Sequence, residues 1–173
     1  MLRVAGSGHR PPKIFTSNPW SDENFKNLTA FIINTIENRQ IDEVITGGAL
    51  GFDQALATAA QYLEIPYSVY IPFEGFNSVW PAKSRNKLEA LCNSAKEVRV
   101  ISNHIGYAKA FQKRNEAMVD NSNYLLCLWD GTQHGGTSNC LEYAASKENY
   151  ETFNLWDSWV KYRDVLDKWL NPS

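Results

Sequence analysis

The fold of this chain is decided by the stretch Glu43-Val44-Ile45-Thr46-Gly47-Gly48-Ala49-Leu50-Gly51-Phe52-Asp53. It passes from a short apolar run through three glycines into an alanine-rich run, which is the order strand, turn, helix. Glycine lets backbone N–H groups come close to a ligand, and a helix N-terminus carries a partial positive charge. The stretch therefore predicts a turn that suits a phosphate or another small anion. The residues assigned to ligand binding here are Thr46, Gly47, Gly48 and Gly51.

A second glycine turn follows another apolar run further along the chain. Residues 124–129 read as a strand, and the segment 130–137, with Asp130-Gly131 and Gly135-Gly136-Thr137, separates it from a helix-like run near Leu141. One such turn is weak evidence, because glycine also serves plain strand-to-helix connections. Two of them in one small α/β pattern favour a nucleotide-type site. The residues predicted to contribute are Asp130, Gly135, Gly136 and Thr137.

Short β-type runs alternate with helix-type runs along the whole chain, which predicts a mostly parallel sheet covered by helices on both faces. We therefore expect a three-layer α/β/α sandwich with about six strands. The strand candidates are Leu2–Ala5, Glu43–Thr46, Tyr67–Ile71, Val98–Ile101, Tyr124–Trp129 and Thr152–Leu155. Helices are expected at Phe25–Ile36 with Ser21 as N-cap, at Ala55–Ala60, and around Leu88, Phe111–Met118, Leu141–Ala144 and Trp159–Leu170.

Length and composition restrict the class of protein. The 173 residues predict one domain spanning 1–173, and 43% hydrophobic with 21% charged residues is ordinary for a soluble globular protein. The net charge of −2 shows no excess of basic residues that could bind a phosphate backbone, so a nucleic-acid partner is disfavoured. No apolar run approaches the roughly 18 residues of a membrane span, and the N-terminus resembles no signal segment. Cys92, Cys127 and Cys140 are widely spaced, which favours reduced core thiols in a cytoplasmic protein.

Two loops are longer than a simple connection needs. Gly8–Lys13 follows the first strand, and Pro72–Pro81 follows the third. In open α/β sheets, ligands bind outside the carboxyl ends of the strands, where these loops and both glycine turns would gather. Ser7, His9 and Arg10, at the end of the first strand, are therefore also predicted to contact the ligand.

Arg114 breaks its local pattern, because it lies with Phe111 and Met118 on the helix face that should be buried. Asn115 shares that face. A buried guanidinium needs a partner or a cavity. Either Arg114 pairs with a carboxylate, for which Asp120, Asp130 and Glu142 are the candidates, or Arg114 and Asn115 bind the ligand.

Three carboxylates have open interpretations. Asp53 lies in the first turn of its helix, where it favours the helix dipole or accepts hydrogen bonds from ribose hydroxyls. Glu74 has aromatic neighbours that would raise its pKa for general acid–base catalysis, or it pairs at the rim with Lys83 or Arg85. Glu142 borders a cleft as a second catalytic candidate, or it lies at the solvent edge of its helix.

No cofactor and no metal site is predicted. The histidines His9, His104 and His134 lack metal-ligand spacing. The chain has no nucleophile elbow, no Walker lysine motif and no Cys–His catalytic signature. Aromatic residues in loops, Trp80 and Phe73 among them, could stack a base or pack against neighbouring loops.

The order of these motifs resembles the YpsA-like branch of the SLOG superfamily. It comprises 45–53, Ile71–Gly75, Arg114-Asn115 with Met118-Val119-Asp120, and the segment 129–137, and the resemblance runs from about residue 6 to 147. It implies a Rossmann-like fold and nucleotide or nucleotide-derived ligands. Related families include the DNA-processing DprA proteins and the Lonely Guy phosphoribohydrolases.

The comparison with Lonely Guy enzymes holds only in part. Those enzymes carry an arginine four residues before a methionine, as Arg114 and Met118 stand here. They also carry a catalytic glutamate three residues after the threonine of a glycine-rich turn. Here Cys140 stands three residues after Thr137, and Glu142 is the nearest glutamate. The phosphate and ribose parts of the site are thus predicted to be retained, and the hydrolytic part is in doubt.

The sequence predicts a protein that binds a nucleotide or nucleotide-derived small molecule at the carboxyl edge of its sheet, as a sensor or sequestering protein. The alternative is an enzyme that cleaves or transfers an N-glycosidic bond of nucleotides, with Glu74 or Glu142 as the catalytic carboxylate. No membrane partner is expected, and a homodimer or higher homo-oligomer is a further expectation.

Overall fold

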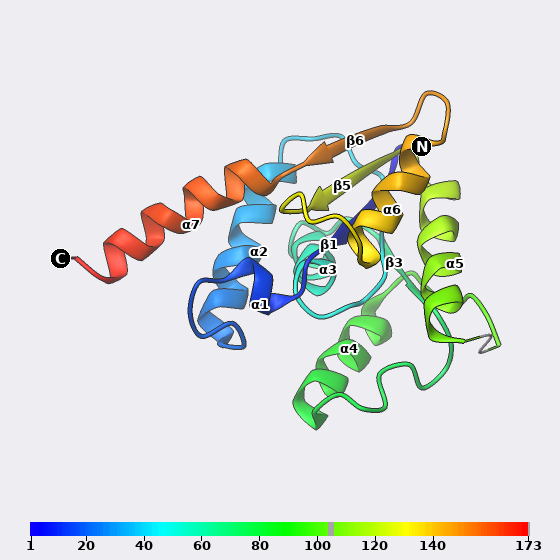
Figure 1. Cartoon of the computed structure of the whole chain (residues 1–173), viewed down its shortest axis with the longest axis horizontal. Helices are drawn as coiled ribbons and strands as arrows, with labels where there is room; N and C mark the ends of the chain where they lie inside the picture. The colour runs from blue at the N-terminus through cyan, green and yellow to red at the C-terminus, as the bar shows by residue number, and fades with distance from the viewer. Residues whose placement is uncertain (104–105, 173) are drawn as a thin grey trace.

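A computed structural model describes residues 1–103 and 106–172 of the chain (Figure 1). Its strands and helices alternate from the N-terminus onward. The strands are β1 (Arg3–Gly8), β2 (Glu43–Thr46), β3 (Tyr67–Ile71), β4 (Glu97–Val100), β5 (Tyr124–Leu128) and β6 (Glu151–Asn154). The helices are α1 (Pro11–Ile14), α2 (Asp22–Ile36), α3 (Phe52–Tyr62), α4 (Ala82–Ser94), α5 (Tyr107–Asp120), α6 (Gly136–Ala145) and α7 (Trp156–Leu170).

All six strands pair in parallel, in the order β4-β3-β2-β1-β5-β6. This confirms the predicted α/β class with its Rossmann-like topology, and each strand lies within three residues of its predicted bounds. The chain winds outward from β1 through β2 and β3 to β4, then crosses back to place β5 on the other side of β1. The order reverses at β1, and the carboxyl ends beside such a reversal are where open α/β sheets bind ligands.

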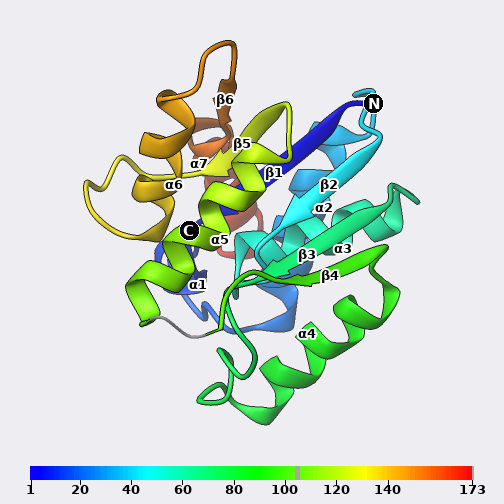
Figure 2. The same cartoon turned by 90° about the vertical axis from the view of Figure 1, so that its right-hand side faces the viewer.

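Helices cover both faces of the sheet (Figure 2). One core layer lies under α2, α3, α4 and α7, and it includes Leu28, Phe52, Leu56 and Trp159. The other lies under α5 and α6 and includes Met118 and Cys140. The central strand β2 is buried throughout, whereas the edge strand β6 is exposed throughout. Burial on both faces is the reason that the central strands read as continuous apolar runs.

Local sequence signals account for the starts of α2 and α1. The Ser21 side chain accepts a hydrogen bond from the Asn24 amide at 3.1 Å, as the N-cap prediction requires. The short helix α1 was not predicted, and it forms because Pro11 occupies a first-turn position where no amide donor is needed. Helix α7 braces α1, since the Trp159 indole donates to the Ile14 carbonyl at 3.1 Å. This contact fixes the loop that carries His9 and Arg10.

Candidate functional site

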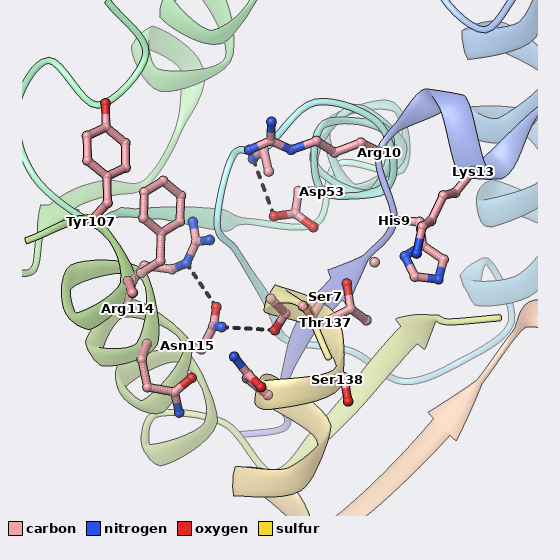
Figure 3. A pocket seen from close by; sticks show the side chains of 18 of the residues that line it. Ser7, His9, Arg10, Lys13, Asp53, Tyr107, Arg114, Asn115, Thr137 and Ser138 are labelled. Carbon is pink, nitrogen blue, oxygen red and sulfur yellow. Dashed lines mark hydrogen bonds between the residues drawn. The ribbon is translucent and has the colours of Figure 1, made fainter. Parts of the chain in front are cut away.

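A pocket of about 690 Å³ lies at the carboxyl edge of the sheet (Figure 3). The loop after β1, the start of α3, the loop after β3, one face of α5 and the start of α6 form its wall. Most of the predicted ligand-binding residues line it, namely Ser7, His9, Arg10, Asp53, Arg114, Asn115, Gly135, Gly136 and Thr137. The gathering of segments far apart in the sequence agrees with the rule for parallel sheets.

The second glycine turn presents the open end of a helix to this pocket. Gly135 has φ +111° and stands at the N-cap of α6, where no side chain caps the helix. The first intrahelical bond runs from the Asn139 amide to the Gly135 carbonyl at 3.0 Å. The amides of residues 136–138 therefore have no intrahelical acceptor. A Cβ on Gly135 or Gly136 would meet no atom within 4 Å, so a ligand can approach this backbone closely.

The first glycine turn is filled by the protein itself. The Gly48 amide donates to the Thr46 hydroxyl at 3.4 Å, and the Ala49 amide donates to the Asp53 carboxylate at 3.3 Å. A Cβ on Gly51 would lie 2.6 Å from the His9 carbonyl oxygen. Thr46, Gly47, Gly48 and Gly51 consequently do not line the pocket and form its supporting layer.

Arg114 is buried on the pocket side of α5, with 6% of its surface exposed. Its Nη1 donates to the Gly47 carbonyl at 2.7 Å, and its Nε donates to the Asn115 side chain at 3.1 Å. The Asn115 amide in turn donates to the Gly136 carbonyl at 3.2 Å, so these two residues join both glycine turns (Figure 3). Of the alternative partners, Asp120 bonds Tyr143 and Lys147, Asp130 bonds His9, and Glu142 is exposed.

Asp53 is the carboxylate beside Arg114, and it also faces the pocket. A Cβ on Gly47 would lie 2.9 Å from Asp53 Oδ2 and 2.3 Å from Arg114 Nη1, so both charged groups abut the same glycine. Burial raises the pKa of the Asp53 carboxyl to about 6, although Arg114 and the Ala49 and Gly8 amides oppose that shift. Burial likewise lowers the pKa of Arg114, and Asp53 opposes that change.

His9 connects the loop after β1 to the loop after β5. Its Nε2 lies 2.8 Å from Asp130 Oδ1, which also accepts hydrogen bonds from the Thr132 amide at 2.9 Å and the Thr132 hydroxyl at 2.5 Å. Burial raises the pKa of Asp130, but the hydrogen bonds from Thr132 and His9 outweigh it and hold that pKa well below its usual range. Burial lowers the pKa of His9, with Asp130 acting against it. Asp130 thus positions His9 from behind the pocket wall.

An aromatic wall stands on the side of α5 and the loop after β3. It consists of Phe76, Trp80, Tyr107 and Phe111, and all four line the pocket. The rings of Tyr107 and Phe111 are stacked, with centroids 5.8 Å apart and planes 14° apart. Of the loop aromatics singled out in the sequence, Trp80 reaches the pocket, whereas Phe73 packs edge-on against Tyr107.

Several residues that line the pocket were not predicted from the sequence as ligand contacts. Lys13 is one of them, and its position three residues after Arg10 could have indicated a second positive charge at the site. Ser138 and Asn139 directly follow the second turn, so the open helix end itself points to them. Phe76 lies in the long loop 72–81 that was expected at this edge of the sheet. Tyr107 and Gln112 had no local signal, because only the packing of α5 against that loop brings them to the pocket.

The two catalytic candidates lie outside the pocket. Glu74 is exposed, and its predicted rim partner Lys83 pairs with Asp22 instead. Glu142 is exposed in a separate groove along α6. Cys140, which replaces the glutamate of the Lonely Guy pattern, is fully buried beneath Ser7 and Arg114.

The three cysteines are free thiols, with Cys127 and Cys140 buried. Among the described residues, no group of three or more His, Cys, Asp or Glu side chains could hold a metal ion. His104 lies outside the described residues. Within the ranges 1–103 and 106–172, none of the helices is both long and apolar enough to cross a bilayer.

Comparison with known proteins gives sequence relatives along most of the chain. It is 32% identical over 156 residues to the SPbeta prophage-derived protein YoqJ of Bacillus subtilis (strain 168). The aligned region covers 81% of this chain and 90% of YoqJ. It is 30% identical over 173 residues to a UPF0398 protein of Lactobacillus helveticus (strain DPC 4571), which covers 91% of this chain and 87% of that protein.

Solved structures share the fold at low identity. The DNA processing protein DprA of Streptococcus pneumoniae superposes with a TM-score of 0.60 at 16% identity over 97% of this chain, which spans only 56% of DprA. DprA of Helicobacter pylori, described for its single-stranded DNA binding mode, gives a TM-score of 0.59 at 13% identity over 98% of this chain and 80% of that protein.

A family model covers the whole site. The YpsA model, which describes the YspA SLOG family, matches residues 7–158. This range contains both glycine turns and every residue that lines the pocket. Together with the relatives above, it shows that this chain belongs to the YspA SLOG family.

Proposed function

We propose that the protein binds a nucleotide or nucleotide-derived small molecule in the pocket at the carboxyl edge of the sheet. One observation carries the proposal: a single pocket joins an anion-binding end to an aromatic wall. The ligand that matches both ends carries a phosphate and a planar ring. SLOG membership supports this reading at the level of the ligand class.

The phosphate is placed at the start of α6. The free amides of residues 136–138 and the dipole of this helix favour an anion. Arg114 adds a fixed guanidinium, while Arg10 and Lys13 add positive charge from the opposite loop. These groups converge on one pocket even though the whole chain has a net charge of −2. The charge is therefore local, as a small anionic ligand requires.

The base is placed against the aromatic wall. Phe76, Trp80, Tyr107 and Phe111 offer faces and edges on which a purine or pyrimidine can stack. Asp53 lies between the two ends, where a carboxylate would repel a phosphate. Its presence is accounted for if it accepts hydrogen bonds from ribose hydroxyls, which replace part of its lost hydration.

Binding is favoured over N-glycosidic cleavage, because neither Glu74 nor Glu142 reaches the pocket. Single-stranded DNA is the second candidate ligand, since the DprA of Helicobacter pylori shares the fold and binds such a strand. The same pocket would then hold one nucleotide of a longer strand.

Calorimetric titration and thermal shift with AMP, ADP, GMP, GDP, UMP, UDP, inorganic phosphate and a single-stranded 15-mer test the proposal. We expect at least one mononucleotide to bind and to raise the melting temperature more than inorganic phosphate does. Gly136→Val should abolish this effect with unchanged melting of the free protein, because its side chain enters open space in front of the amides. Ala145→Val, at the far end of α6, is the control.

Three results separate the candidates. Tight binding of the 15-mer without any mononucleotide binding would favour the DNA reading. Release of free base at about 1 per second or faster, abolished by Asp53→Asn, would make the protein an N-glycosidase. Ligand binding that survives Gly136→Val would contradict the placement of the phosphate.

A further inference from the structure

The edge strand β4 is open to pairing with another strand. It lies at one margin of the sheet, and β3 is its sole strand partner in the described part of the chain (Figure 2). No backbone group of the described loops and turns bonds its outer edge. A free row of N–H and C=O groups can pair with a strand of another chain, and natural edges often carry proline or lysine that prevents this. The four residues of β4 include neither.

One face of β4 leaves two valines uncovered. Val98 pairs in register with Val69, which is fully buried, yet 41% of Val98 is exposed. Val100 is 43% exposed on the same face, because successive side chains of a strand alternate. Lys96, just before the strand, does not protect this edge, since its ammonium group bonds the Glu43 carboxylate at 2.8 Å. A second strand laid beside β4 would remove this apolar surface from water.

The opposite face of β4 carries an acid and a base side by side. Arg99 Nε donates to Glu97 Oε1 at 3.0 Å, and Arg99 Nη2 donates to Glu97 Oε2 at 3.2 Å. The guanidinium also lies over the Tyr70 ring, 4.7 Å from its centroid, which holds it on this face. Both charged side chains are partly exposed, so each can contact another chain.

This charge pattern is complementary to itself. An antiparallel pair of identical strands places one residue across from itself and its two neighbours across from each other. With Val98 on the axis, Glu97 lies across from the partner's Arg99, and Arg99 lies across from the partner's Glu97. With Arg99 on the axis, two guanidinium groups would face each other, which is unfavourable. The other edge strand, β6, has Glu151 as its single charged residue and offers no such pairs.

We propose that β4 pairs antiparallel with β4 of a second copy of this chain, about a two-fold axis through Val98. The pairing joins two six-stranded sheets into one, with two opposite-charge pairs on one face and the valines on the other. The contact is short, which predicts a dissociation constant in the micromolar range. Residues 97–100 do not line the pocket, so the contact uses no part of the proposed ligand site.

Sedimentation velocity over a series of protein concentrations tests this contact with two charge-reversed variants. Glu97→Arg leaves two arginines on the charged face of β4, and Arg99→Glu leaves two glutamates. Each variant alone should dimerise about tenfold or more weakly than the unmodified protein, because like charges then face each other across the axis. An equimolar mixture of the two variants should recover the original affinity, because every arginine then faces a glutamate. A change within one chain cannot produce this recovery.

Two further variants complete the test, and their melting temperatures show that they are folded. Glu151→Arg makes the same charge change on β6 and should leave dimerisation unchanged. Val98→Lys places like charges on the axis at a partly exposed position, so it should leave a folded monomer. An unmodified protein that is monomeric at every concentration would overturn the inference. The same holds if either single charge reversal dimerises normally, or if their mixture stays monomeric.

Discussion

The two glycine turns start from similar sequence and end in different structural roles. In the turn at 46–51, the amides bond Thr46 and Asp53, and the space before the glycines is occupied by Arg114, Asp53 and backbone. In the turn at 130–137, the amides at the start of α6 are open, and Gly135 and Gly136 face empty space. Glycine thus serves close internal packing in the first turn and leaves the backbone uncovered in the second. The same residue type permits both, because each requires the absence of a Cβ.

The largest effect on the free energy of unfolding should come from replacing Gly51 by alanine. Gly135, which also has a positive φ, is the matched position for comparison. Gly51→Ala puts a Cβ 2.6 Å from the His9 carbonyl oxygen at φ +94°, so strain and overlap add to about 3–5 kcal/mol. Gly135→Ala, at φ +111° with no atom within 4 Å, should cost about 1–2 kcal/mol from strain alone. Urea unfolding of both variants measures the difference. Equal losses would mean that the first turn is no more tightly packed than the second.

The next largest effect on stability concerns the charge interaction between the buried side chains of Arg114 and Asp53, which both lie beside Gly47. Arg114→Met removes the cation that stabilises a buried carboxylate, and we expect a loss of about 3 kcal/mol at pH 8. In the folded protein the raised Asp53 pKa makes the free energy of unfolding fall as the pH rises from about 4 to about 6. Without Arg114 the pKa of Asp53 rises further. The stability that Arg114→Met loses relative to the unmodified protein should therefore be larger at pH 8 than at pH 5.

Adding Asp53→Asn to Arg114→Met provides the control, because it removes the uncompensated charge. The double variant should recover part of the stability at pH 8 and little at pH 5, as measured by urea unfolding. A deficit that is the same at both pH values would show that Arg114 stabilises the turn by packing and its bond to Gly47 rather than by charge.

The smallest effect should come from the link between the loop after β1 and the second turn. Asp130→Ala removes the acceptor shared by His9 and Thr132, and we expect a loss of about 1–2 kcal/mol at pH 7. Because the folded-state pKa of Asp130 is depressed, its contribution is present at neutral pH and is lost as the pH falls below about 4. The difference in melting temperature between the unmodified protein and Asp130→Ala should therefore be smaller at pH 3.5 than at pH 7. A gap that widens in acid would contradict the role of the carboxylate.

The layered fold could be predicted from local patterns because each signal acts within a few residues. The apolar runs at 43–46 and 67–71 match β2 and β3 residue for residue, and Ser21 caps α2 through its own neighbour. The end of β1 was predicted too early, since Gly6, Ser7 and Gly8 lack strand propensity. Their pairing with β5 holds them in the sheet.

The sequence could predict which segments meet at the site, but not the contacts between their side chains. The parallel strand order brings the loop after β1, Arg114 and the second turn to one edge, so those assignments follow from topology. The hydrogen-bond partner of Arg114 on the first turn could not be found in this way. The Gly47 carbonyl lies 67 positions away, and Asp53 comes near the guanidinium only because both side chains lie beside Gly47 in the fold.

The sequence by itself determined the alternation of strands and helices, the two turns and the residue types that gather at the carboxyl edge, because hydrophobic periodicity and glycine content are local properties. Only the tertiary structure decided which turn is filled and which is open, and that Glu74 and Glu142 lie outside the pocket. Those outcomes depend on which side chains from distant segments occupy the same space, and close packing allows only one arrangement of them.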